Sequence, residues 1–432
     1  MRLSSLSGLI ARLAGVGGKF VVTFVLAREA GAAAVGEFAL FFGAVNILVF
    51  LIGLDFHLFS IRELLLRQTA AGRLRVMGGQ LAVDGSIYGV FIVLALLAGL
   101  TGVASLLPVP LGWLVAITIG DHLASQFSRA FMMLRRPHLA NLIYAAKSGL
   151  WGWVGCAAIF AGFLPAHLEP FYLLWFVFDV AAVVLGAAAM SLAMRGARLS
   201  RPGNMSGWFQ RGFRTSRYFY ATSVSTMLIA YLDRFVIAGN AGVAEAGVYA
   251  FWQSIAGLLP ILVYAVAGMH YLPILVESYK RRRMEAFHGA AAGFLKQTVA
   301  LCLMTGALVL ILSPWIAGLI GKPEIQFDWS LILFLLVGAM GNALWQVPYQ
   351  ILYSAGEDKF LAATLILITA VWGVADFLVI PFAGIHGAAA IVATANLIIY
   401  LWLQRTAAQH LQSGARGLSA VRSPLLDRSV EA

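Results

Sequence analysis

Long apolar runs separated by short polar segments make up most of the chain. Each run is close to the roughly 20 residues that a helix needs to cross a ~30 Å hydrocarbon core. None of the segments between them is long enough for a soluble domain. The pattern therefore predicts an all-α polytopic membrane protein with about twelve transmembrane helices. These lie at about 7–28, 33–54, 77–100, 109–133, 139–163, 170–194, 216–238, 246–273, 288–313, 329–353, 359–381 and 387–404.

Composition supports this interpretation. Of the 432 residues, 61% are hydrophobic and 11% are charged, and the mean hydropathy is +0.87. Soluble domains are about 45–50% apolar and about 25% charged. The composition excludes a disordered chain, a collagen-like chain and an ordinary soluble enzyme. The two cysteines, Cys156 and Cys302, lie in apolar runs, so we expect small core residues and no disulfide framework.

The basic residues are distributed asymmetrically between alternate connectors. With the N-terminus placed in the cytoplasm, 23 of the 30 Lys and Arg residues fall on the inner side, including Arg129. Only Arg28 and Lys322 fall on outer connectors. This positive-inside asymmetry predicts that both termini are cytoplasmic. It also accounts for the formal charge of +11 through anionic membrane lipids, without nucleic acid as a partner.

Two segments half a chain apart resemble each other. The segment Ala30–Ala39 matches Ala241–Ala250 at five positions with an offset of 211 residues, and Trp151-Gly152 matches Trp372-Gly373 with an offset of 221. We expect two six-helix lobes of the same orientation, related by a pseudo-two-fold axis along the membrane normal. The alternative is that Gly and Ala recur because small residues let membrane helices pack closely. The predicted divisions are an N-lobe at 1–195, a basic cytoplasmic connector at 196–215, a C-lobe at 216–405 and a cytoplasmic tail at 406–432.

Ionisable side chains inside the apolar runs are the candidate functional residues. Each one at a span centre costs roughly 2.5–3.5 kcal/mol, so we expect them to face a hydrated cavity or to pair with one another. The basic candidates for substrate binding are Arg12, Lys19, Lys147, Arg234 and Lys296, and the acidic candidates are Asp84, Asp121, Asp179 and Asp376. The acidic residues would supply an ion-coupling site or ion-pair partners for the basic residues. Arg234 could instead pair with its neighbour Asp233.

The chain lacks the sequence signatures of catalysis. It has no zinc-ligand spacing, no complete phosphate-binding loop and no nucleophile elbow. We therefore expect no catalytic residues, no metal and no cofactor. The enzyme alternative is a membrane-embedded glycan-processing enzyme. The largest predicted outer connector, about 314–328, is short for a catalytic segment.

Several short motifs resemble those of a known family. The segments are Tyr231–Ala238 with Ala246–Tyr249, Leu352–Lys359, Gly384–Ala390, Gly31–Gly36, Gly53–Asp55 and Ile61–Glu63. In these motifs and in its span count the chain resembles the oligosaccharide flippases, the Wzx-like branch of the multidrug/oligosaccharidyl-lipid/polysaccharide exporter superfamily.

This resemblance implies a MATE-like fold with two lobes around a central cavity and alternating access. It implies a polyprenyl-pyrophosphate-linked oligosaccharide as the substrate, moved to the outer leaflet of the bacterial inner membrane for O-antigen (lipopolysaccharide), capsule or exopolysaccharide synthesis. A polysaccharide polymerase and a chain-length regulator are the implied partners. The pyrophosphate would need cations of the kind found at Arg12, Lys19, Arg234 and Lys296. The alternative on the same fold is a drug or cation antiporter with acidic residues lining the cavity.

Overall fold

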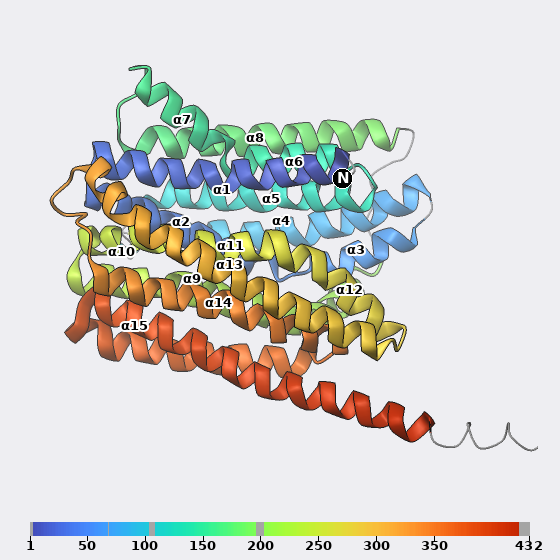
Figure 1. Ribbon diagram of the computed structural model, residues 1–432. Helices are drawn as coiled ribbons and strands as arrows, with labels where there is room; N and C mark the ends of the chain where they lie inside the picture. Colours follow the sequence, from blue (N-terminus) through green and yellow to red (C-terminus); the bar gives the residue numbers. More distant parts are fainter. Residues whose placement is uncertain (1–2, 68, 103–108, 196–202, 423–432) are drawn as a thin grey trace, which may run out of the picture. The chain divides into compact units, whose positions relative to one another are not determined.

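The computed structural model describes residues 3–67, 69–102, 109–195 and 203–422, and nearly all of them are helical (Figure 1). The elements in chain order are α1 (Leu3–Glu29), α2 (Ala32–Gly53), α3 (His57–Leu66), α4 (Ala70–Leu100), α5 (Leu111–Met133), α6 (Pro137–Ala145), the π-helical turn η2 (Ala146–Leu150), α7 (Trp151–Phe160), α8 (Leu168–Ala193), α9 (Met205–Ala241), α10 (Val243–Ala256), α11 (Leu258–Val263), the π-helical turn η3 (Tyr264–Gly268), α12 (Met269–Lys280), α13 (Met284–Ile320), α14 (Trp329–Ala355) and α15 (Asp358–Arg422).

The predicted all-helical membrane fold is confirmed. Among the described residues, eight helical runs are long and apolar enough to cross a membrane. One of them, Asp358–Gln409, contains two predicted spans, because Gly384 has a φ of 55° and breaks α15 into two helices. The runs α1, α5 and α6–η2–α7 match the remaining predicted spans, so the described part of the chain contains all twelve.

The structure adds helix where the apolar pattern predicted connectors. The predicted connector 55–76 contains α3, which buries Phe59 and Leu64 on one side. Helix α9 begins inside the basic connector, at a cap where Asn204 Oδ1 accepts a hydrogen bond from the backbone of Gly207 at 2.8 Å. A polar stretch ends the apolar run that marks a membrane span, but it does not end the helix, because a helix requires only that its backbone groups be hydrogen-bonded.

The chain divides into two compact units. The first comprises Met1–Phe251 and Leu319–Gln326, and the second comprises Trp252–Gly318 and Phe327–Ala432. In the first unit α9 packs against α2 and α3. This division rests on contacts within each unit and does not test the predicted repeat. The lobes 1–195 and 216–405 therefore stay a prediction.

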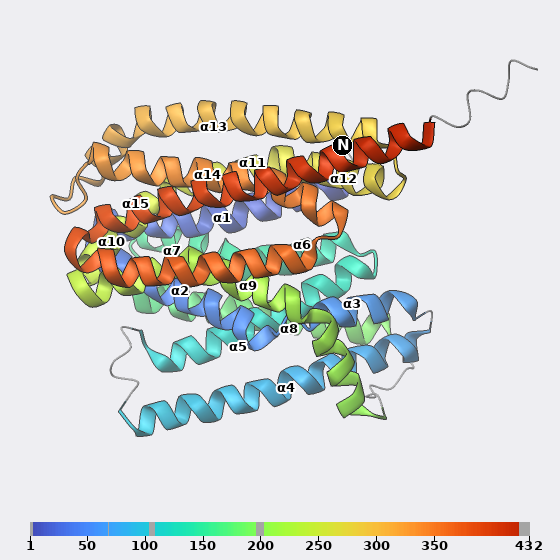
Figure 2. The same ribbon diagram turned by 90° about the horizontal axis from the view of Figure 1, so that it is seen from below.

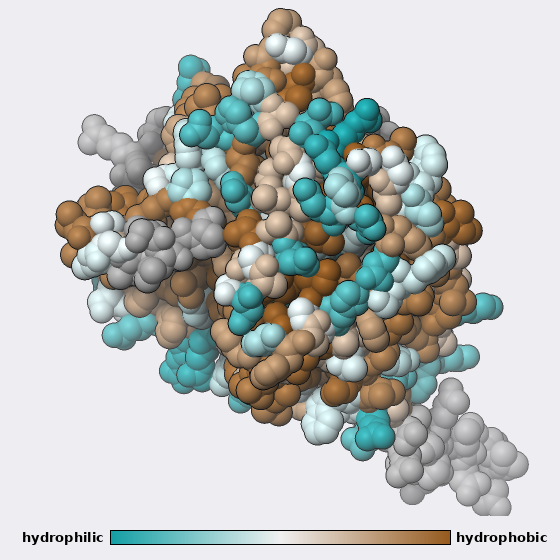
Figure 3. Space-filling view, turned by 90° about the vertical axis from the view of Figure 1, so that its left-hand side faces the viewer, coloured by the Kyte–Doolittle hydropathy of each residue, from teal (hydrophilic) through white to brown (hydrophobic). Residues whose placement is uncertain are grey.

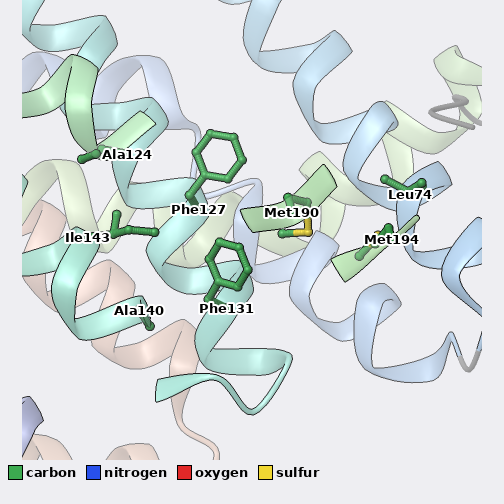
Figure 4. Packing of buried hydrophobic residues seen from close by; sticks show 9 residues of the cluster. Leu74, Ala124, Phe127, Phe131, Ala140, Ile143, Met190 and Met194 are labelled. Carbon is green, nitrogen blue, oxygen red and sulfur yellow. The ribbon is translucent and has the colours of Figure 1, made fainter. Parts of the chain in front are cut away.

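One apolar core of the first unit lies where α4, α5, α6 and α8 meet (Figure 4). Phe127 and Phe131 of α5 are buried there with Ile143 of α6 and Met190 of α8. A Cβ on Gly186 would lie only 2.5 Å from the Phe127 ring, so a glycine is required for α8 to approach α5 this closely. Close packing of this kind holds membrane helices together, since lipid removes the hydrophobic advantage of helix contact.

Apolar side chains cover the outward faces of the helices. In α4, every residue from Gly85 to Leu100 is exposed or half-buried, and Figure 2 shows this helix at the margin of its unit. Figure 3 looks onto one end of the molecule, where hydrophilic residues are interspersed with hydrophobic ones. This distribution is expected where apolar helices emerge from the hydrocarbon core.

Candidate functional site

Two basic residues of the first unit lie over aromatic rings that contact each other. The Lys19 ammonium of α1 is 4.5 Å from the Phe42 ring centroid, and the Arg234 guanidinium of α9 is 5.0 Å from that of Tyr231. The two rings meet edge to face, with centroids 5.9 Å apart and planes at 75°. A cation over a ring is stabilised by ~0.5–2 kcal/mol, the larger value applying where water is excluded. We call these four residues the cation–aromatic ladder.

Helices α2 and α9 bring the two rings of the ladder together. A Cβ on Gly43 would lie 3.3 Å from the Tyr231 ring and 3.4 Å from Phe235, so the small residue lets α9 lie close to α2. Phe42 and Tyr231 then contact each other across this approach. All four ladder residues are half-buried, which leaves part of each side chain accessible.

The Arg234 end of the ladder is fixed by its neighbour Asp233. One carboxylate oxygen of Asp233 accepts a hydrogen bond from the backbone N–H of Arg234 at 2.8 Å. The other accepts from the Tyr249 hydroxyl at 2.5 Å. Asp233 is buried, and its hydrogen bond with Tyr249 joins α9 to α10.

Lys147 and Asp121 form an ion pair with 2.7 Å between Nζ and Oδ1. Their side chains are only 12% and 11% exposed. Ion pairing was one of the alternatives for these residues, and the structure shows it. Lys147 lies on the π-helical turn η2, where Gly149 approaches the backbone of Gly15 on α1 so closely that a Cβ would overlap its carbonyl oxygen.

Asp179 lies on α8 in the same unit and is fully buried. Neither carboxylate oxygen has a hydrogen-bond partner among the described residues. Asp121, Lys147 and Lys19 are the charged groups close enough to act on it. The four residues therefore place two acids and two bases together inside the first unit.

Asp84 belongs to a separate polar cluster of the first unit. Its Oδ1 accepts a hydrogen bond from Gln80 at 2.8 Å, and Ser60 donates to Gln80 in turn. Arg129 lines a cavity of about 50 Å³ beside Gln80, His57 and Gln126. The sequence placed Arg129 among the connector charges, whereas the structure places it inside the unit, near Asp55, Asp121 and Asp84.

The remaining candidates are not part of these groups. Arg12 is on α1, but its side chain lies outside the described residues. Lys296 is exposed on α13, and Asp376 is fully buried on α15, both in the second unit. Where side chains are described, no three His, Cys, Asp or Glu residues are grouped so as to hold a metal ion.

Sequence reasoning missed Phe42, Tyr231 and Arg129. Tyr231 precedes Arg234 by three residues and so shares its helix face, a signal that the sequence does carry. The pairing of Lys19 with Phe42 depends on how α1 packs against α2, and no local pattern encodes it.

Comparison with solved structures shows what this fold resembles. No family model and no curated protein matches the chain. An inward-facing multidrug resistance MATE family transporter of the MOP superfamily matches with a TM-score of 0.68 at 14% identity, over 95% of this chain and 99% of that one. The chain has a MATE-like fold.

Two further matches differ in how their function is described. The MATE multidrug transporter DinF-BH, solved in a complex, matches with a TM-score of 0.62 at 12% identity, over 94% of each chain. A MOP superfamily transporter from Pyrococcus furiosus matches with a TM-score of 0.53 at 13% identity, over 96% of this chain and 95% of that one. Its binding pocket is described as having reverse polarity, suggesting a different function. At these identities the matches establish the fold alone.

Proposed function

We propose that this protein is a flippase for a polyprenyl-pyrophosphate-linked oligosaccharide. It works by alternating access in a bacterial cytoplasmic membrane, with both termini in the cytoplasm. The observation that carries the proposal is the cation–aromatic ladder, in which Lys19 and Arg234 are held on adjoining rings. The positive-inside asymmetry supports the orientation.

The chemistry of the ladder suits a pyrophosphate. Its two phosphates carry spread negative charge, and the ladder offers one ammonium and one guanidinium. Arginine binds phosphate oxygens with two parallel hydrogen bonds, while lysine acts as a point charge. In the described part of the chain, Lys19 makes no ion pair within 4 Å, so an anionic ligand would satisfy a cation that is otherwise expensive in a membrane.

The aromatic rings contribute to the same task. Phe42 and Tyr231 attract the cations through their ring faces, and a ring face does not neutralise a cation as a carboxylate would. Lys19, which makes no ion pair within 4 Å among the described residues, thus keeps its positive charge and favours an anion over a hydrophobic cation. In this proposal the glycan passes on the hydrated side of the ladder while the prenyl chain stays in lipid.

A drug or cation antiporter is the second candidate, and Asp179 is the observation that favours it. Its buried carboxylate has no hydrogen-bond partner among the described residues and is suited to take up a proton or to attract a cation. In the flippase, the same residue would couple transport to an ion gradient. The two candidates therefore differ in the substrate and share the coupling group.

The test locates the lipid-linked glycan in cells that lack this protein. Right-side-out vesicles are treated with an impermeant sugar-reactive reagent before and after the membrane is opened. A flippase predicts that the glycan is protected until the membrane is opened. Glycan that reaches the outer face as in wild-type cells contradicts the proposal and favours the antiporter, and a chemically altered glycan indicates an enzyme.

Variants then assign the role of the ladder. Lys19→Gln and Arg234→Gln should each reduce glycan exposure at least about tenfold in the complemented strain. Arg211→Gln is the matched control, since Arg211 is an exposed arginine on the same helix as Arg234. Equal activity of all three variants at equal expression would exclude the ladder as the anion site.

A further inference from the structure

The two repeated segments of the sequence contact each other in the first unit. A Cβ on Gly36 would overlap the carbonyl oxygen of Val243, and a Cβ on Gly247 would overlap the carbonyl oxygen of Ala32. Both glycines are buried. The N-terminal turns of α2 and α10 therefore touch backbone to backbone.

This contact is reciprocal under the sequence repeat. The offset of 211 residues carries Ala32 onto Val243 and Gly36 onto Gly247. The contact from Gly36 to Val243 thus becomes the contact from Gly247 to Ala32. Such an exchange is what a two-fold axis between the segments produces. A local pseudo-two-fold axis accordingly passes through this crossing.

The backbone leading into the crossing repeats as well. Gly31 has a φ of 86° and Gly242 a φ of 94°, and each precedes its helix directly. Phe38 and Tyr249, again 211 residues apart, are both buried behind the crossing. Both turns need glycine because other residues rarely adopt this left-handed region.

A third segment covers the crossing. The connector segment Leu319–Gln326 begins with the last two residues of α13, whose other residues belong to the second unit, yet this segment belongs to the first. Its Glu324 carboxylate accepts a hydrogen bond from the Ala32 N–H at 3.4 Å, at the positive end of the α2 dipole. Ile325 in this connector is fully buried.

The crossing lies at one end of the membrane-spanning helix α2. This helix is 22 residues long, about 33 Å at 1.5 Å per residue, and it separates the crossing from the basic connector that carries Arg62 and Arg67. By the positive-inside rule this end is the outer one. A path for a glycan along this helix would have to open here.

We infer that the crossing of 31–36 with 242–247 is the outer seal of the transport path and that the Glu324 connector is its latch. The inference rests on the proposed alternating access. The seal closes by direct backbone contact between small residues, so it needs no large side chain to swing away. Opening separates the two turns and breaks the hydrogen bond of Glu324 to Ala32.

The test measures access from the outer side. A cysteine replaces Asn46 in a background in which Cys156 and Cys302 are alanine, and an impermeant maleimide is added to right-side-out vesicles. Asn46 lies ten residues beyond Gly36 on α2, about 15 Å deeper. Gly36→Ala and Gly247→Ala should each raise the labelling rate at least about tenfold, because the added methyl group pushes the turns apart.

Gly239→Ala is the matched control. Gly239 lies on the same end of α9, and a Cβ there would meet no atom within 4 Å. It should leave the labelling rate unchanged. Unaltered labelling in Gly36→Ala and Gly247→Ala, or rapid labelling before any substitution, overturns the seal.

A milder pair of variants covers the case in which the glycine variants fail to fold. Glu324→Ala removes only the acceptor for Ala32 and should raise labelling a few-fold. Glu169→Ala, which removes an exposed carboxylate in the first turn of α8, should not. Equal rates in these two variants reject the latch. Labelling reports on the seal without any glycan, so a failed flippase assay with raised labelling would reject the substrate and keep the seal.

Discussion

The Lys147 ammonium lies 2.7 Å from a carboxylate oxygen of Asp121, and this pair ties the π-helical turn η2 to α5. The same pair lies near Asp179, whose own oxygens have no hydrogen-bond partner where the structure is described. A buried pair of this kind has a measurable signature, because losing one partner leaves the other charge uncompensated.

Breaking the pair should destabilise the protein. Lys147→Met is expected to lower the free energy of unfolding by ~3–5 kcal/mol, and combining it with Asp121→Leu should restore much of that loss. Thermal melting of the purified protein in one detergent measures both. Losses that simply add in the double variant would show that the two groups do not depend on each other.

The two rings of the ladder carry no charge but should still affect the rate of transport. Tyr231→Leu and Phe42→Leu are expected to slow glycan flipping about 2- to 30-fold, the equivalent of ~0.5–2 kcal/mol of cation–ring attraction. Tyr231→Phe keeps a ring and should retain most of the rate. Flipping is measured in proteoliposomes, and Phe209→Leu, an exposed ring elsewhere on α9, serves as the control. A slow Tyr231→Phe variant would assign the effect to the hydroxyl group instead.

The approach of α1 to the π-helical turn should depend on glycine. A Cβ on Gly18 would overlap the carbonyl oxygen of Gly149, so Gly18→Ala is expected to lose ~1–3 kcal/mol of stability. Gly85→Ala is the counterpart, since a Cβ there would meet nothing within 4 Å. It should be neutral or stabilising by up to ~1 kcal/mol. Gly18→Ala should therefore lower the melting temperature, whereas Gly85→Ala should leave it unchanged or raise it. Equal shifts would contradict the close approach.

Protonation of Asp328, which precedes α14, should lower the stability of the protein at low pH. Partial burial acts to raise the pKa of this carboxyl. Hydrogen bonds from Ser330, from His386 at 2.7 Å and from the Leu331 backbone outweigh it, holding the pKa at about 2.

A carboxyl in the unfolded chain has a pKa of ~3.9. Asp328 therefore contributes stability above about pH 4, and the contribution is lost as the pH falls through about 2. The melting temperature should drop between about pH 5 and about pH 2, and Asp328→Asn should reduce that drop. An identical pH profile in the variant would show that other carboxyls dominate acid unfolding.

The sequence predicted the spans because an apolar run long enough to cross lipid has few other structures open to it. It did not predict α3, whose short amphipathic pattern over Phe59 and Leu64 is common in connectors. It could not place the π-helical turn at Lys147, since a widened turn depends on the approach of α1 and leaves no periodic signature.

For the candidate site, the sequence predicted which residues carry charge inside the membrane, but it did not predict which groups they contact. The cost of a charge in lipid marks Lys19, Lys147 and Arg234 as functional candidates without any structure. Which group each one meets follows from helix packing. Lys147 pairs with a carboxylate and also lies over the Tyr144 ring, and Lys19 and Arg234 lie over Phe42 and Tyr231. Arg129 was not a candidate, because a basic residue near the end of a predicted span is usually solvated. The structure instead places it beside a cavity inside the first unit.

The reciprocal crossing of the α2 and α10 turns also limits which substitutions the two repeated segments can accept. Gly36 and Gly247 each face a backbone carbonyl of the other segment, of Val243 and of Ala32 respectively, and a substitution at Val243 or Ala32 leaves that carbonyl in place. A larger side chain at either glycine therefore has no compensating change at the residue that it meets. Gly36 and Gly247 should accordingly both remain glycine among homologues, whereas lipid-facing positions change independently.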